Sequence, residues 1–264
     1  MNVGEILNYI NELAPWKFAE DWDNVGLMLG GRADEVKKVL LCLDVTTKVI
    51  DEAIDQGANL IISHHPFLFS KLNTVDLDTM KGKQISTLIK NNINIISAHT
   101  NLDVAVGGVN DTFAEAIGIS NCRILESYIP KGHDVDVGMG KVGELPSELR
   151  FEDLVNIVKR NLNIENLRII GTQPETVKNV ATFCGSFDVD LDIIKQQSID
   201  VLITGDMKYH DSLDAREMGL CIIDVGHFAS EHLIVNKLKK LLEVRFESLN
   251  IICSSLEEDP FIFA

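Results

Sequence analysis

The stretch VKKVLLCLDVTTKVIDEAIDQGANLIISHH, residues 36–65, decides the fold of this chain. Its first apolar run, residues 38–43, and its last, residues 60–63, have the length and the aliphatic content of buried strands. Between them, residues 46–56 carry apolar side chains on one helical face, and Gly57 is expected to end this helix. Strand, helix and strand in this order predict a βαβ unit with two parallel strands.

Apolar runs of the same kind follow along the chain and alternate with helical patterns. Residues 1–13 place their apolar side chains on one face and predict an amphipathic helix. The further predicted strands are residues 93–98, 167–171, 179–184, 201–204, 220–225 and 250–254. This alternation predicts an α/β fold with mostly parallel, mixed sheets.

The βαβ unit recurs in the second half of the sequence. Residues 36–65 align without a gap with residues 177–206, with strand on strand and helix on helix. With the following segment shortened, His99-x-x-x-Asp103 aligns with His227-x-x-x-Glu231. Any two βαβ units look alike to some degree, which is the alternative to a true repeat. If the repeat is real, we expect two related α/β domains that face each other across a cleft, to which the carboxyl ends of the strands supply polar residues.

The two ends of the chain are expected to belong to one domain. We expect a first α/β domain from residues 1–124 and 225–264, and a second from residues 125–224. Residues 129–149, rich in glycine and charge, predict a loop or hairpin that opens the second half.

Composition excludes several classes of partner. The chain has 24 Lys and Arg against 40 Asp and Glu, a formal net charge of -16. Such a surface repels nucleic acid and anionic bilayers, and no apolar run is long enough to span a membrane. The five cysteines are odd in number and mostly lie in apolar stretches, which indicates buried, reduced thiols. We therefore expect a soluble, cytoplasmic protein.

Two adjacent histidines, His64 and His65, directly follow the strand at residues 60–63. Open α/β folds place their ligands at this carboxyl edge of the sheet. Adjacent residues at a strand end point in different directions, so the pair suits two neighbouring metal ions better than one. The alternative is a histidine pair packed at a turn before Pro66.

Two more strand ends carry a histidine followed four residues later by an acid, His99 with Asp103 and His227 with Glu231. Either acid alone is also explained as a helix-capping residue. Carboxylates mixed with imidazoles favour zinc, manganese or iron over magnesium and calcium, and carboxylates can bridge two cations. From spacing alone, His99 remains a candidate ligand.

Two other strings carry polar residues. Asp206, Lys208 and His210 follow the strand at 201–204, and they are candidates for substrate contacts or proton transfer, with a solvated turn as the alternative. The string Trp22-Asp23-Asn24-Val25-Gly26-Leu27 is interpreted as a structural turn beneath the core.

Taken together, these strings resemble those of the Nif-like dinuclear-metal family, the type 2 GTP cyclohydrolase I homologues. The resemblance rests on the Trp22 to Leu27 string, Ser63-His64-His65-Pro66, His99-Thr100-Asn101-Leu102-Asp103, the segment from Thr204 to His210, and Gly226-His227 through Glu231. The motifs occur in the family's order and cover nearly the whole chain.

The resemblance implies a two-domain subunit in a ring-shaped homohexamer, with two divalent metal ions in each subunit. The implied metal ligands are His64, His65, Asp103, His227 and Glu231, with Glu231 as the bridge. His99 and His210 are implied to lie close by as non-ligand catalytic groups. This chain departs from the family at Cys184 to Asp190, where Phe187 and two acids replace a small glycine-rich turn and weaken any claim that the loop binds phosphate.

Two functions are compatible with such a centre. The first is a dinuclear metal-dependent hydrolase that attacks its substrate with a metal-bound hydroxide, with His99 or His210 moving the proton. The resemblance implies GTP or a related nucleotide as the substrate. The second is a non-catalytic metal-binding protein that serves metal homeostasis or regulation. The same ligands serve both functions, so the sequence does not separate them.

Overall fold

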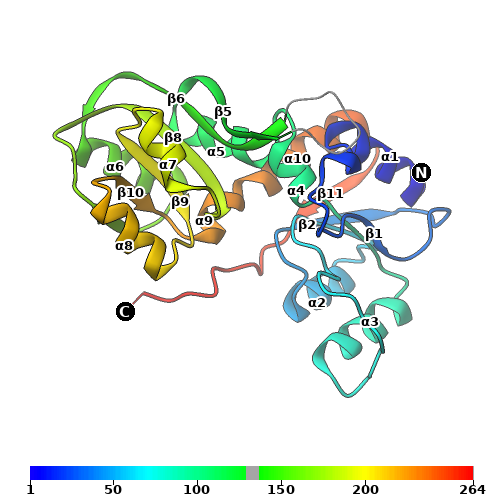
Figure 1. Cartoon of the computed structure of the whole chain (residues 1–264). Coiled ribbons are helices and arrows are strands. Elements are labelled where there is room, and N and C mark those ends of the chain that lie inside the picture. The colour runs from blue at the N-terminus through cyan, green and yellow to red at the C-terminus, as the bar shows by residue number, and fades with distance from the viewer. Residues whose placement is uncertain (129–136, 264) are drawn as a thin grey trace. The chain divides into compact units, whose positions relative to one another are not determined.

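The computed structural model describes residues 1–128 and 137–263, and the chain divides into two compact units (Figure 1). Unit 1 consists of Met1–Ala105 and Ile234–Glu258, and unit 2 consists of Val106–Leu233 and the described residues from Asp259 onward. Each unit contains one β-sheet with its own helices and core. The domain boundaries expected from the sequence, after residues 124 and 224, stay a prediction.

The sheet of unit 1 has five strands in the order β1-β4-β3-β2-β11. β1 runs antiparallel to β4, and all other neighbours are parallel. The strands span Gly26–Leu29 (β1), Lys38–Cys42 (β2), Leu60–Ser63 (β3), Asn94–Ser97 (β4) and Asn250–Cys253 (β11). Every residue of β3 and β4 is buried, as expected for inner strands of a parallel sheet covered on both faces.

Capping side chains start several helices of unit 1. Asn2 and Glu5 form a reciprocal capping box at the start of α1, and Thr46 caps α2. The helical segments are α1 (Val3–Leu13), the 3-10 helix Trp16–Phe18, α2 (Thr47–Asp55), α3 (Met80–Lys90), α4 (Thr100–Val104) and α10 (Leu233–Arg245). Side chains from α2 and α3 pack with β2, β3 and β4 to form one apolar core.

The sheet of unit 2 has six strands in the order β5-β6-β8-β9-β10-β7. Strands β8, β9 and β10 are parallel, and the flanking strands are antiparallel. The strands span Ser120–Tyr128 (β5), Val137–Arg150 (β6), Arg168–Gly171 (β7), Thr176–Ser186 (β8), Val201–Gly205 (β9) and Cys221–Asp224 (β10). The helices are α5 (Val109–Ile117), α6 (Phe151–Leu162), α7 (Leu191–Gln196), α8 (Tyr209–Glu217) and α9 (His227–Glu231).

The predicted repeat is visible in the strand registers. Val39 pairs with Leu60 between β2 and β3, and Val180 pairs with Val201 between β8 and β9, so the two units use the same register at the aligned positions. Both repeats also continue to a third parallel strand and an antiparallel edge strand, β4 with β1 and β10 with β7. The predicted α/β class with two related parts is therefore confirmed.

The register corrects one detail of the repeat. Ala98 donates its backbone N–H to Ser63, and Val225 donates its own to the equivalent Thr204. Ala98 therefore corresponds to Val225, and His99 corresponds to Gly226 rather than to His227. The alignment of His99 on His227 was wrong by one residue.

All eight predicted strands are present, and within residues 1–128 and 137–263 the prediction missed three strands, namely β1, β5 and β6. Of residues 129–149, those from Val137 onward belong to β6, which pairs antiparallel with β5, so the hairpin alternative is correct there. Residues 129–136 lie outside the described residues. Across the residues that the structure describes, no helix is long and apolar enough to cross a membrane.

All five cysteines are free thiols, but they are not all buried. Cys42, Cys184 and Cys221 are buried and Cys253 is partly so, whereas Cys122 is exposed and contradicts the prediction. Burial raises the pKa of Cys221 to about 12, which keeps this thiol protonated at neutral pH.

Candidate metal centre

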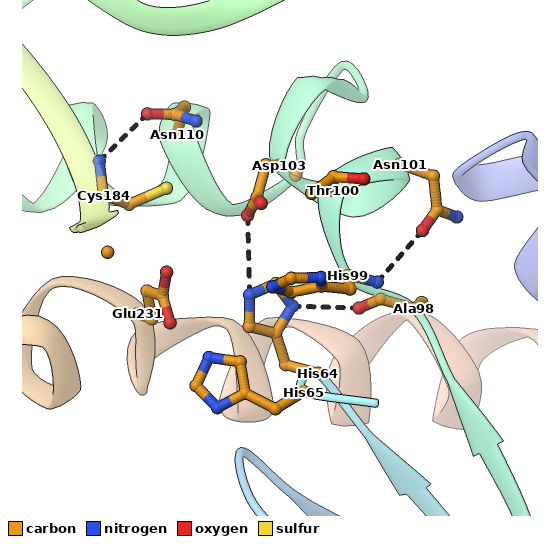
Figure 2. A network of polar contacts seen from close by, with 12 residues as sticks. His64, His65, Ala98, His99, Thr100, Asn101, Asp103, Asn110, Cys184 and Glu231 are labelled. Atoms are coloured by element: carbon orange, nitrogen blue, oxygen red, sulfur yellow. Dashed lines mark hydrogen bonds and ion pairs between the residues drawn. The ribbon is translucent and has the colours of Figure 1, made fainter. Parts of the chain in front are cut away.

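The three histidines of unit 1 meet at the carboxyl ends of two neighbouring parallel strands. His64 and His65 directly follow β3, and His99 follows β4 as the residue that precedes α4. Asp103 lies on α4, four residues beyond His99. Because β3 and β4 are paired to their last residues, their following residues lie together. Figure 2 shows the three imidazoles grouped below Asp103.

The imidazoles lie close enough to share a cation. Their ring centroids are 5.0 Å apart for His64 and His65, 5.2 Å for His64 and His99, and 5.6 Å for His65 and His99. Each offers a potential ligand atom within 4.8 Å of the others. Asp103 adds a carboxylate, with its Oδ1 3.5 Å from Nε2 of His64.

Hydrogen bonds fix which nitrogen of His64 and His65 is available. The Nδ1 of His64 lies 2.9 Å from the carbonyl oxygen of Ala98, and the Nδ1 of His65 lies 2.9 Å from Oδ1 of Asp44. Carbonyl and carboxylate oxygens only accept, so in both rings Nδ1 donates its proton. The neutral rings then carry their lone pairs on Nε2, the arrangement typical of metal-ligating histidines.

His99 is oriented by Asp23, from the string interpreted as a structural turn. Oδ1 of Asp23 lies 2.9 Å from Nδ1 of His99, and Oδ2 accepts from the backbone N–H of Thr100 at 3.1 Å and from its hydroxyl at 2.6 Å. Burial by itself raises the pKa of Asp23, but the hydrogen bonds from His99 and Thr100 outweigh it and hold that pKa below its ordinary value. Asp23 therefore stays ionised at neutral pH and keeps the proton of His99 on Nδ1.

Unit 2 carries a second group of ligand-type side chains, on α9. The Nε2 of His227 lies 3.0 Å from Oε2 of Glu231, one turn along the helix. The Nδ1 of His227 lies 3.0 Å from Oδ2 of Asp206, which follows β9. Asp206 thus orients His227 in unit 2 as Asp44 orients His65 in unit 1.

The end of β8 packs against Glu231 and its neighbour Ser230. Ser230 accepts a hydrogen bond from the backbone N–H of Gly185 at 2.9 Å and donates to the carbonyl of His227 at 2.8 Å. Gly185 has a left-handed φ of 68°, and a Cβ at this position would lie 2.2 Å from Oε1 of Glu231. The glycine therefore makes the space that the carboxylate of Glu231 occupies.

Asp224, at the end of β10, holds the two turns next to His227. Its Oδ2 accepts from the backbone N–H of Met207 at 3.0 Å, and its Oδ1 accepts from the N–H of Gly226 at 2.9 Å. The carboxylate is 2 % exposed and also forms an ion pair with Arg168. Asp224 thus fixes the positions on both sides of the Asp206 and His227 pair.

The other candidates of unit 2 lie near or on an acidic cavity of about 590 Å³. Its lining includes Lys208 and the acids Asp188 and Asp190 of the loop after β8, and Lys208 lies 3.7 Å from Asp188. So acidic a lining does not suit a phosphate group. His210 is exposed in the first turn of α8 and contacts the ring of Tyr209, and among the described residues it joins no group of three or more potential metal ligands.

The donors of both units fit a divalent transition metal. Two ligands that each lie about 2.0–2.1 Å from one tetrahedral zinc ion are about 3.3 Å apart. The separation of 3.5 Å between His64 and Asp103 and that of 3.0 Å between His227 and Glu231 are both close to this value. Imidazoles mixed with carboxylates suit zinc, manganese and iron.

Sequence reasoning missed Asp44 as an orienting residue and misjudged Asp23. Asp44 follows the end of β2, the strand adjacent to the one that carries His65, and this position was the available signal. The Trp22 side chain next to Asp23 is 60 % exposed, so the turn does not lie beneath the core.

The orienting role of Asp44 leads to a prediction. An Asp44→Ala variant is expected to weaken metal binding by about 10-fold or more, because Nδ1 of His65 loses the acceptor that fixes its tautomer. Competition with a coloured chelator measures the affinity. Asp51→Ala, an exposed acid on α2, serves as the control for lost charge. Equal affinities for both variants would contradict the assignment.

A comparison with known protein families gives a match over nearly the whole chain. The family model for Duf34/NIF3 (NGG1p interacting factor 3) matches residues 1–260. A "GTP cyclohydrolase 1 type 2 homolog" of Clostridium perfringens is 41 % identical over 264 residues, which covers 100 % of both chains.

Solved structures share the fold over the same extent. A Bacillus cereus protein related to NIF3 superimposes with a TM-score of 0.91 at 28 % identity, covering 100 % of this chain and 99 % of that one. A Staphylococcus aureus hypothetical protein gives a TM-score of 0.91 at 32 % identity with the same coverage.

Proposed function

This chain belongs to the DUF34/NIF3 family, and on that basis we propose that it is a dinuclear metal-dependent hydrolase. The ligands in this proposal are His64, His65 and Asp103 from unit 1 with His227 and Glu231 from unit 2. These residues would hold two divalent ions per subunit, zinc, iron or manganese, and Glu231 would be the ligand that both ions share.

The observation that carries the proposal is the orientation of the imidazoles. His64, His65 and His227 each have Nδ1 against a carbonyl or carboxylate oxygen, which leaves Nε2 to face a cation. Histidines that only packed in a turn would have no reason to share this arrangement. His227 and Glu231 supply just two donors, which are too few for two ions, so the proposed ligand set combines them with His64, His65 and Asp103.

The chemistry assigned to the chain's own residues is proton transfer and positioning. A pair of divalent ions supplies Lewis acidity and lowers the pKa of water towards about 7. His99, held by ionised Asp23, keeps Nε2 free to accept a proton from the attacking water. His210 is the other candidate for proton transfer, as a donor to the leaving group. Because its side chain is exposed, it is a weaker candidate than His99.

The proposed substrate is GTP or a related nucleotide, in line with the name that the Clostridium perfringens relative carries. A net charge of -16 repels a triphosphate in general, so the cations would have to offset that repulsion. We also propose that the chain assembles into a homohexameric ring in the cytoplasm, and that it binds neither membranes nor nucleic acid.

Metal content and turnover test this function together. The native protein is expected to hold about two ions per subunit, and His65→Ala and Asp103→Ala are each expected to lose most of this metal, because each removes a direct ligand. Elemental analysis of the purified protein measures the content. Retention of both ions in both variants would remove the site assignment.

Turnover is measured on metal-loaded protein with GTP, other nucleotides and phosphoesters. Glu231→Ala is expected to abolish it, whereas Glu243→Ala, an exposed acid on α10, is expected to leave it unchanged. Equal turnover in native and Glu231→Ala protein would identify a contaminant and reject the enzyme. Two bound ions with no turnover of any substrate would favour the metal-homeostasis alternative.

A further inference from the structure

Two large aromatic side chains of unit 1 are exposed beside the histidine group. Trp22 is 60 % exposed and Phe69 is 59 % exposed, although both are residues that folding usually covers at least partly. Their ring centroids lie 5.9 Å apart with the planes tilted by 56°. We call Trp22 and Phe69 the aromatic pair.

The aromatic pair contacts the histidine that the proposed mechanism uses. The ring of His99 lies 6.0 Å from Trp22 and 6.2 Å from Phe69, edge-on to both. His99 in turn lies within the group of His64 and His65. A ligand that stacks on either exposed ring is therefore one side chain away from the proposed metal ligands.

Polar anchors next to each ring hold the aromatic pair in place. Asp23, adjacent to Trp22, has a fully buried carboxylate that is bound to His99 and Thr100. Asn24 donates from Nδ2 to the carbonyl oxygen of Leu68, the neighbour of Phe69, at 2.6 Å. The two loops that carry the rings are thus tied to each other and to His99, so the rings are exposed on a fixed support.

A fixed, exposed aromatic face selects for a flat partner. Stacking on a planar ring needs no charge on the ligand, and a base stacked on an aromatic side chain contributes about 1–3 kcal/mol. A flexible aliphatic chain gains no comparable advantage from a tilted pair. The acids beside Trp22, Glu20 and Asp21, disfavour an anionic group at the same place, so phosphates of a ligand would have to point away from the pair.

We propose that Trp22 and Phe69 form the subsite that binds a planar nitrogen heterocycle of the substrate, of the size of a purine base. This inference rests on the proposed function, since it assigns the part of the substrate that does not touch the metal ions. It makes the aromatic pair a specificity determinant, and it places the ring of the substrate against His99.

The experiment uses Trp22 as the probe. The chain has two tryptophans, so Trp16→Phe leaves Trp22 as the single tryptophan of the full-length protein. Guanosine 5′-monophosphate is titrated into this protein, with ribose 5-phosphate as the matched ligand that lacks the ring. The nucleotide is expected to quench Trp22 emission saturably, and ribose 5-phosphate is expected to leave the emission unchanged.

Phe69→Ala in the same background removes half of the aromatic pair. It is expected to weaken nucleotide binding by about 5- to 100-fold, the loss of one stacking partner. Leu77→Ala is the matched control. Leu77 lies in the same chain segment and is 55 % exposed, but its side chain is aliphatic. Circular dichroism and thermal melting confirm that the variants are folded.

The inference is overturned by equal affinity for the nucleotide and ribose 5-phosphate, or by unchanged affinity in Phe69→Ala. It is also overturned if Trp22 is shielded from solvent before any ligand is added and its emission varies with protein concentration. A second copy of the chain then covers the aromatic pair. The titration is run on metal-free and metal-loaded protein. Ring-dependent quenching in a protein that binds no metal and has no turnover would reject the proposed function and keep the subsite. Turnover that is the same for substrates with and without the ring would reject the subsite and keep the proposed function.

Discussion

A Gly185→Ala variant is expected to weaken metal binding by about 100-fold, the largest effect expected from any single methyl group in this protein. The added Cβ would lie 2.2 Å from Oε1 of Glu231, a distance that no real contact allows. Either the Glu231 carboxylate must leave its position, or the end of β8 must shift and disturb the hydrogen bond from Gly185 to Ser230, the residue next to Glu231. Chelator competition measures the loss.

The control for this variant is Gly219→Ala. Gly219 has a left-handed φ of 75°, close to that of Gly185, but a Cβ there meets no atom within 4 Å. Both substitutions cost about 1–2 kcal/mol of stability for placing alanine in the left-handed region. Metal affinity should fall in Gly185→Ala alone, and an equal fall in both variants would attribute the effect to backbone strain.

The largest expected effect on stability comes from Asp224→Asn. The native carboxylate accepts hydrogen bonds from two backbone N–H groups and forms an ion pair with Arg168. Asp224 itself is almost completely buried from solvent. An asparagine amide presents a donor where one of those N–H groups needs an acceptor. We therefore expect the free energy of unfolding to fall by about 3 kcal/mol, measured by urea denaturation.

Arg168→Gln separates the two roles of Asp224. The arginine side chain is 59 % exposed, so removing its charge is expected to cost about 1 kcal/mol or less. If Asp224→Asn were no more destabilising than Arg168→Gln, the backbone acceptor role would be contradicted.

The positions of His64, His65 and His99 were predictable because a general rule fixes them. Inner strands of a parallel sheet are apolar throughout, so their ends are visible in the sequence, and neighbouring carboxyl ends lie together. The three strands that were missed are of another kind. β1 is a short edge strand, and β5 and β6 form an antiparallel pair whose pattern is broken by glycines and Pro146.

Residues that orient the histidines were harder to predict, since their contacts join distant parts of the chain. Asp23 reaches across 76 positions to His99, and Asp44 lies 21 positions from His65. Neither pair has a local spacing to reveal it. The one-residue shift between His99 and His227 has a related cause, because both histidines follow a strand and only the hydrogen-bond ladder shows where each strand ends.

The central claim is that side chains of both units bind one pair of ions. Crystals of the native protein loaded with zinc or manganese test it most directly, through an anomalous difference map at the metal absorption edge. The account predicts two peaks about 3.5 to 4 Å apart, both in contact with Glu231 and flanked by His64, His65, Asp103 and His227. A single peak held by one unit alone, or no peak at these side chains, would contradict it.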